Sequence, residues 1–150
     1  MFSSEGNELA ALQAALTHSQ SWVELHANQR QNLLNFFLIA IAFLFNAYVA
    51  ALNGRHAFLA AVISLLGVAI SFSFTMMDLR NRDLTRAGEI AMRDLENRLA
   101  HTHNMPSLRI METIDEPRHP WLSIGKLIRA IHISVGSVFL GATIYALIIA

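Results

Sequence analysis

Two long apolar runs joined by a short polar turn dominate the first half of the chain. They cover residues 33–52, LLNFFLIAIAFLFNAYVAAL, and 57–77, AFLAAVISLLGVAISFSFTMM, and neither contains a charged residue. A run of about 20 apolar residues lets a helix cross the hydrocarbon core of a bilayer. The linking residues 53–56 include Asn-Gly, which is typical of tight turns. The pattern therefore predicts an antiparallel transmembrane hairpin.

Both predicted spans continue into amphipathic segments on the side away from the turn. Residues 1–32 place leucines at helical spacing ahead of the first span, which predicts one continuous helix from Glu8 to Leu52. Residues 78–103 follow the second span and carry acid-before-base pairs four residues apart, such as Asp94 and Arg98, which stabilise exposed helices. We expect the two segments to form a stalk of about 35 Å beyond the membrane.

A hairpin of two such helices predicts its own register. Residues that face each other across a tight turn should have numbers that add up to about 110, because both helices rise by roughly 1.5 Å per residue. Polar residues of the two helices then meet, and hydrogen bonds between helices help to hold them together in lipid. The predicted partners are Asn46 with Ser64, Asn35 with Thr75, Asn32 with Asp78, and Glu24 with Arg86.

The last part of the chain predicts a third span. Residues 104–128 contain Pro106, Pro117 and Pro120 and read as a linker followed by an interfacial segment. Residues 129–150 are again apolar and long enough to cross a bilayer. The fold class predicted from the whole pattern is an all-α membrane protein. It has three transmembrane helices, and the first two form a long antiparallel hairpin extended into a cytoplasmic two-helix stalk.

Composition agrees with a small membrane protein. The chain is 54% hydrophobic and 15% charged, with a mean hydropathy of +0.41. Its formal net charge is zero, which argues against direct binding of nucleic acid. Cysteine is absent, which excludes thiolate chemistry. The polar, acidic start predicts no signal peptide, so the first apolar run is expected to act as the insertion signal.

The distribution of cations predicts the orientation. Eight of the eleven Lys and Arg residues lie between the second and third spans and a ninth, Arg129, lies at the border of the third, whereas the hairpin turn holds only Arg55. The positive-inside rule then places the N-terminus and the stalk in the cytoplasm and the C-terminus on the other side of the membrane.

Polar and small residues within the spans are the candidate assembly residues. Asn35 and Asn46 read either as the polar lining of a pore or as hydrogen-bonding partners within the hairpin, and the pairing register favours the second interpretation. On the third span, Ser134, Ser137, Gly141 and Tyr145 share a stripe, which either packs against the hairpin or contacts another subunit. The full set of intramembrane polar and assembly residues is Asn35, Asn46, Ser64, Ser71, Thr75, Ser137 and Gly141.

The ionisable residues predict no catalytic or metal chemistry. His132 lies about one turn inside the third span, where we expect it to anchor the helix at the interface. His101 and His103, with Glu112, Asp115, Glu116 and His119, match no zinc signature. No nucleophile motif or phosphate-binding loop is present, so we expect neither an enzyme nor a cofactor. The exposed arginines of the charged helix are candidates for contact with a trigger or partner: Arg80, Arg82, Arg86 and Arg93.

The borders of the hairpin spans carry a resemblance to a known class. Residues 29–38, QRQNLLNFFL, enter the first span, and residues 77–84, MDLRNRDL, leave the second, followed by Gly88-Glu89 and Leu95-Glu96. The arrangement resembles the small helical transmembrane effectors of bacterial anti-phage defence systems, in which a two-helix membrane unit is coupled to a cytoplasmic sensor. The resemblance implies a module that assembles when triggered and breaches the inner membrane. Because the chain has no recognisable nucleotide-sensing domain, the trigger would come through another protein or through residues 78–128.

Two functions are therefore expected. The first is an oligomerising inner-membrane effector that permeabilises or depolarises the membrane when triggered, with the lipid bilayer, further copies of itself and a cytoplasmic sensor protein as partners. The alternative is a non-toxic membrane adaptor that assembles a larger complex through its stalk. A small transporter is disfavoured because only His132 is ionisable within a span.

Overall fold

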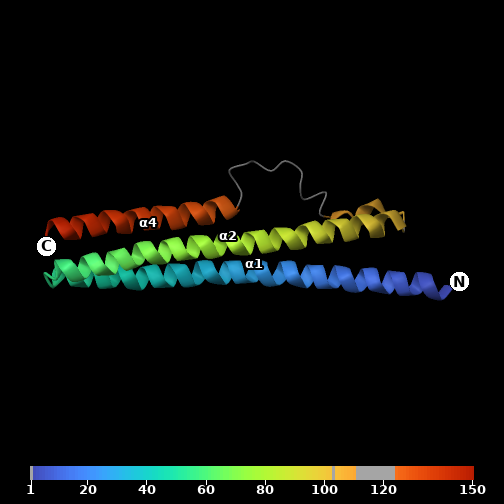
Figure 1. Cartoon of the computed structure of the whole chain (residues 1–150), viewed down its shortest axis with the longest axis horizontal. Helices are drawn as coiled ribbons and strands as arrows, with labels where there is room; N and C mark the ends of the chain where they lie inside the picture. The colour runs from blue at the N-terminus through green and yellow to red at the C-terminus, as the bar shows by residue number, and fades with distance from the viewer. Residues whose placement is uncertain (1, 103, 111–123) are drawn as a thin grey trace. The chain divides into compact units, whose positions relative to one another are not determined.

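A computed structural model describes residues 2–102, 104–110 and 124–150 and is helical almost throughout (Figure 1). Helix α1 covers Phe2–Asn53, α2 covers Ala57–Thr102, and α4 covers Ile124–Ile148; a short 3₁₀ turn, η1, covers Pro106–Leu108. Among the described residues, these three α-helices are long and apolar enough to cross a membrane. The predicted fold class, an all-α protein with three transmembrane helices, is confirmed.

Contacts divide the chain into two units. The described parts of the first, the two-helix unit, are residues 2–29, 81–102 and 104–110. The described parts of the second, the three-helix unit, are residues 30–80 and 124–150. The apolar runs of the sequence fall in the three-helix unit, and the charged part of α2 falls in the two-helix unit.

The turn between α1 and α2 closes as the sequence predicts, although a different residue adopts the unusual backbone conformation. The amide of His56 donates to the Ala51 carbonyl at 2.9 Å, and that of Arg55 donates to Leu52 at 2.9 Å. This pair of hydrogen bonds is the common C-terminal capping motif of helices. Its left-handed residue is Arg55, with φ 59°, rather than Gly54.

The predicted register of the hairpin is confirmed within each unit. In the three-helix unit, the Phe37 and Phe74 rings lie 5.4 Å apart, and Arg30 meets Asp78. In the two-helix unit, Gly88 lies against Trp22 and Val23. The residue numbers of these pairs add up to between 108 and 111, as expected from the length of the turn.

Helix α4 packs against both other helices of the three-helix unit: its Thr143 bonds Ser64 of α2, and its Ala142 carbonyl accepts a hydrogen bond from Tyr48 of α1. Figure 1 shows α4 alongside α2. Helix α4 runs antiparallel to α2, with Thr143 beside Ser64 and Gly136 beside Ser71. It therefore runs parallel to α1, and an α4 residue lies level with the α1 residue about 95 positions earlier, as for His132 and Phe37.

The buried positions repeat at alternating spacings of three and four residues. In the three-helix unit they include Ala60, Ser64, Gly67, Ser71 and Asp78 of α2, and Ile128, His132, Phe139, Thr143 and Ala146 of α4. This period of 3.5 residues is that of left-handed coiled-coil packing, in which one seam of each helix faces its neighbours. Helix α4 begins at Ile124, and its seam includes Gly125 and Ile128 ahead of the apolar run 129–150.

Candidate functional site: the polar seam and the outward faces of the three-helix unit

A buried ion pair joins α1 to α2 at one end of the apolar runs. Arg30 Nε donates to Asp78 Oδ1 at 2.6 Å, and Nη2 lies 3.4 Å from Oδ2. The two side chains are only 18% and 3% exposed. Gly125 of α4 leaves room for the guanidinium, because a Cβ there would lie 2.9 Å from Arg30 Nη2. One ion pair thus involves all three helices.

This pair corrects the predicted partner of Asp78. The sequence placed Asn32 opposite it, but Asn32 is exposed and the carboxylate binds Arg30 instead. The error is half a helical turn, which moves a side chain from the seam to the outside. The signal that could have found Arg30 is its place on the 3.5-residue repeat, seven residues before the buried Phe37.

His132 lies in the same seam, and the prediction that it anchors the helix at the interface is wrong. It is 2% exposed and packs edge-on against Phe37, with ring centroids 4.3 Å apart; Phe74 lies 6.4 Å away on the α2 side. Neither ring nitrogen has a hydrogen-bond partner among the described residues. A buried polar group without a partner costs about 1–3 kcal/mol, so His132 is a costly choice at a core position.

We expect His132→Leu to stabilise the three-helix unit by about 1 kcal/mol, because leucine fills the seam without an unsatisfied nitrogen. Unfolding of the detergent-solubilised protein by increasing mole fractions of SDS, followed by circular dichroism, measures this. Phe37→Leu, one helix away in the same cluster, is the matched control and should lose stability. A lower stability of His132→Leu would mean that the imidazole makes a contact essential to the fold.

Hydroxyl groups connect α2 to α4 further along the seam. Thr143 Oγ1 donates to Ser64 Oγ at 2.9 Å, and the Ser64 hydroxyl is within 3.0 Å of the carbonyls of Ala60 and Ala61. Ser71 bonds the Gly67 carbonyl at 2.9 Å. Small residues allow this close approach, since a Cβ on Gly67 would lie 2.5 Å from the Phe139 ring. The seam is therefore a small-residue, hydroxyl-bearing interface of the kind that joins helices in lipid.

The predicted partners of these hydroxyls are consequently wrong. Ser64 was expected to meet Asn46 but bonds Thr143, and Thr75 was expected to meet Asn35 but bonds the Ser71 carbonyl at 2.8 Å. Within the described residues, no hydrogen bond joins Asn35 or Asn46 to α2, and Asn46 Nδ2 donates to its own helix, at Ala42, at 2.8 Å. Both asparagines are exposed. They do not hold the hairpin together in the single chain.

The stripe on α4 lies on the outside as well. Ser134, Ser137, Gly141 and Tyr145 are all exposed. The Ser137 hydroxyl bonds its own helix at Ile133, and a Cβ on Gly141 would meet nothing within 4 Å. Of the two interpretations given to this stripe, packing against the hairpin is wrong for the single chain.

The candidate trigger residues are exposed on α2. Arg80 belongs to the three-helix unit, and Arg82, Arg86 and Arg93 belong to the two-helix unit. The expected pairing of Glu24 with Arg86 is absent from the described interactions, and both side chains are exposed. Asp94 and Arg98 form the predicted pair four residues apart, at 3.0 Å.

Sequence reasoning missed the contact that Trp22 makes in the two-helix unit. Trp22 Nε1 donates to the Leu84 carbonyl at 3.1 Å, and the indole lies over Gly88, where a Cβ would be 2.8 Å from the ring. His26 packs edge-on against Trp22 at 4.7 Å. A tryptophan opposite a glycine at the predicted register was the available signal.

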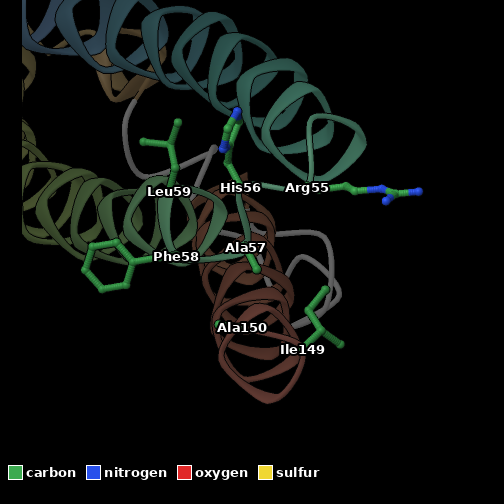
Figure 2. A pocket seen from close by; sticks show the side chains of 7 residues that line it. All are labelled: Arg55, His56, Ala57, Phe58, Leu59, Ile149 and Ala150. Atoms are coloured by element: carbon green, nitrogen blue, oxygen red, sulfur yellow. The ribbon is translucent and has the colours of Figure 1, made fainter.

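A hollow at the hairpin turn brings no reactive groups together (Figure 2). It is lined by Arg55, His56, Ala57, Phe58, Leu59, Ile149 and Ala150. Figure 2 shows Arg55 extending away from the helices while His56 turns toward α1. Within the described ranges, no cluster of three His, Asp or Glu residues has the geometry of a metal site. His103, Glu112, Asp115, Glu116 and His119, together with the predicted interfacial residue Trp121, lie outside those ranges.

Comparison with known proteins places the chain in a family. The model of the octameric membrane protein family (8xMP) matches residues 14–149, which include α2, α4 and most of α1. The chain belongs to this family. It is therefore a membrane protein that forms homo-oligomers, and the exposed polar stripes on α1 and α4 belong to an oligomer subunit.

One curated relative adds a context. The chain is 34% identical over 85 residues to CD-NTase-associated protein 19 of Escherichia coli, an alignment that covers 55% of this chain and 56% of the relative. The match thus spans about half the length of that protein. No solved structure matches the chain. The resemblance inferred from the sequence, to small helical membrane proteins of bacterial defence systems, is confirmed by the family and by this relative.

Proposed function

We propose that the chain is the subunit of an octameric effector that permeabilises or depolarises the bacterial inner membrane when triggered during anti-phage defence. The name of the family supports eight copies, and the name of the relative supports association with a CD-NTase. The observation that carries the proposal is the pair of exposed polar stripes within the spans of a single chain. Polar groups that face lipid are costly, so a subunit built this way is completed by other copies.

We further propose that the charged segments receive the trigger. The excess of cations between the second and third spans supports a cytoplasmic N-terminus and a cytoplasmic two-helix unit, with the C-terminus in the periplasm. Arg80, Arg82 and Arg86 are exposed and available to a phosphate group or an acidic partner surface. Arg93, also exposed, extends the same helix. A sensor protein that binds there would change the assembly across the membrane.

The alternative is a non-toxic adaptor that anchors a larger complex through the two-helix unit. The length of α2 beyond its apolar run favours this alternative, since a docking helix needs a long exposed face. The two functions differ in their effect on the membrane. An adaptor leaves the membrane intact at any level of expression.

We expect overproduction in E. coli to collapse the membrane potential, read with a voltage-sensitive dye, because a high subunit concentration replaces the trigger by mass action. The purified protein should also release a small fluorescent dye from vesicles of E. coli lipids. An unrelated three-helix membrane protein at equal abundance controls for overloading of the insertion machinery. Normal potential together with intact vesicles, at a level where native mass spectrometry detects the oligomer, would favour the adaptor.

A further inference from the structure

All three helices expose large apolar side chains suited to lipid, such as Phe43 of α1, Phe58 and Phe72 of α2, and Val138 of α4. Helices α1 and α4 also expose small or polar residues that share one face. The α1 stripe is defined as Asn35, Ala42 and Asn46, with the exposed Ile39 between them, and the α4 stripe as Ser134, Ser137, Gly141 and Tyr145. Each of these two stripes lies opposite the buried seam of its own helix, since Phe37 and His132 are on the far side.

Asn46 is the residue for which exposure to lipid is most costly. Its amide offers two N–H donors and one carbonyl acceptor, and the chain itself satisfies one donor, at the Ala42 carbonyl. Hydrocarbon supplies no hydrogen bonds for the rest. Asn46 lies inside the first apolar run, 16 residues from Arg30 and seven residues, about 10 Å along the helix, from Asn53 at the turn. A neighbouring copy in the membrane can provide the missing partners at this depth.

The depth of the two stripes identifies that molecule. Because α4 runs parallel to α1 with an offset of about 95 residues, Gly141 lies level with Asn46 within one chain, and Ser137 lies level with Ala42. Rotation about an axis normal to the membrane leaves depth unchanged. In a ring of copies, the α4 stripe of one subunit therefore stands at the depth of the α1 stripe of the next.

We propose that neighbouring subunits join head to tail, with the α4 stripe of one copy packed on the α1 stripe of the next. Gly141, over which a side chain would meet open space, lets the Asn46 amide of the neighbour approach the α4 backbone. The hydroxyls of Ser137 and Tyr145 lie one turn to either side of Gly141. They are the hydrogen-bond partners of the neighbour's Asn46 amide. Two different faces in contact make a heterologous interface, which closes into a ring when the rotation fits the copy number. The inference rests on the oligomer within the proposed function and not on permeabilisation.

The absence of native cysteine makes the interface directly testable by disulfide crosslinking in membranes. Asn46→Cys combined with Gly141→Cys should give, on mild oxidation, a ladder of bands from dimer to octamer. Ala42→Cys combined with Ser137→Cys, the pair one turn away, should give the same ladder and guards against a misfolded first variant. The matched control pairs Asn46→Cys with Leu140→Cys, whose side chain is exposed on a different face of α4, and should give little product.

The other arrangements give different results. Dimers from either single-cysteine variant would indicate a two-fold, face-to-self interface and would overturn the proposal. No ladder from either double variant, with the octamer present by native mass spectrometry, would also overturn it. Labelling of the Asn46→Cys octamer by a membrane-impermeant maleimide would in that case place the α1 stripe along a water-filled pore. A crosslinking ladder without dye release from vesicles would support the proposed interface and contradict permeabilisation of the membrane. Dye release without a ladder would support permeabilisation and contradict the proposed interface.

Discussion

Replacing Asp78 by alanine is expected to destabilise the three-helix unit by about 3–5 kcal/mol, because it leaves the Arg30 guanidinium buried without its partner. Arg30 approaches Asp78 at 2.6 Å, and the packing around Gly125 gives the guanidinium little room to turn away. SDS-induced unfolding of the detergent-solubilised protein, followed by circular dichroism, measures the loss. A shift of the midpoint to a lower SDS mole fraction is the expected result.

A double variant separates the cost of an unpaired charge from the value of the pair. In Arg30→Met with Asp78→Leu both charges are removed, and apolar side chains of similar size fill the seam. Such replacements are commonly neutral or stabilising, so we expect stability near that of the native chain. If Asp78→Ala alone unfolds at the native midpoint, the ion pair contributes nothing to the packing of the three helices.

The parts of the fold that depend on neighbours in sequence were predictable. Two uncharged runs of spanning length, joined by residues 53–56, determine an antiparallel hairpin, and the length of the turn determines its register. Phe37 and Phe74, far from the turn, still lie within that register. Because the helices are long and without interior proline, an error at the turn would have propagated to every pair. The register is therefore the most secure prediction that the sequence allowed.

The parts that depend on α4 were not predictable from the hairpin. A numbering rule for two helices assigns every polar side chain of α2 to α1, but Ser64 and Ser71 turn toward α4 instead. The sequence predicted a third span but gave no register for it, since the linker before it is long and contains three prolines. The choice between seam and outside follows from the 3.5-residue repeat, which a count of polar residues overlooks. That repeat places His132 inside and leaves Asn46 outside.

One set of polar residues thus holds the single chain together, and a different set remains available to other copies. Inside, Arg30 bonds Asp78 and Thr143 bonds Ser64 within a single chain. Outside, Asn46 retains unused hydrogen-bonding capacity. Substitutions inside should therefore change the stability of the subunit, whereas substitutions outside should change assembly. Both Gly67 and Gly141 lie in helices, but we expect substitution of the seam glycine Gly67 to lower the stability of the subunit and substitution of the outward glycine Gly141 to leave that stability unchanged.

Gly67→Ala is expected to destabilise the three-helix unit by about 1–3 kcal/mol, the usual cost of adding a methyl group to a packed core. The new Cβ would lie 2.5 to 2.9 Å from three atoms of the Phe139 ring, which is 4% exposed and cannot turn aside without moving α4. Gly141→Ala is the matched control, because its Cβ meets nothing within 4 Å and alanine favours helix over glycine. SDS-induced unfolding should therefore show a loss of stability for Gly67→Ala and none for Gly141→Ala.

Adding Phe139→Leu to Gly67→Ala relieves the overlap and should restore part of the stability, since the two sites are in direct contact. Equal stabilities for Gly67→Ala and the native chain would mean that α4 does not pack on α2 at this position.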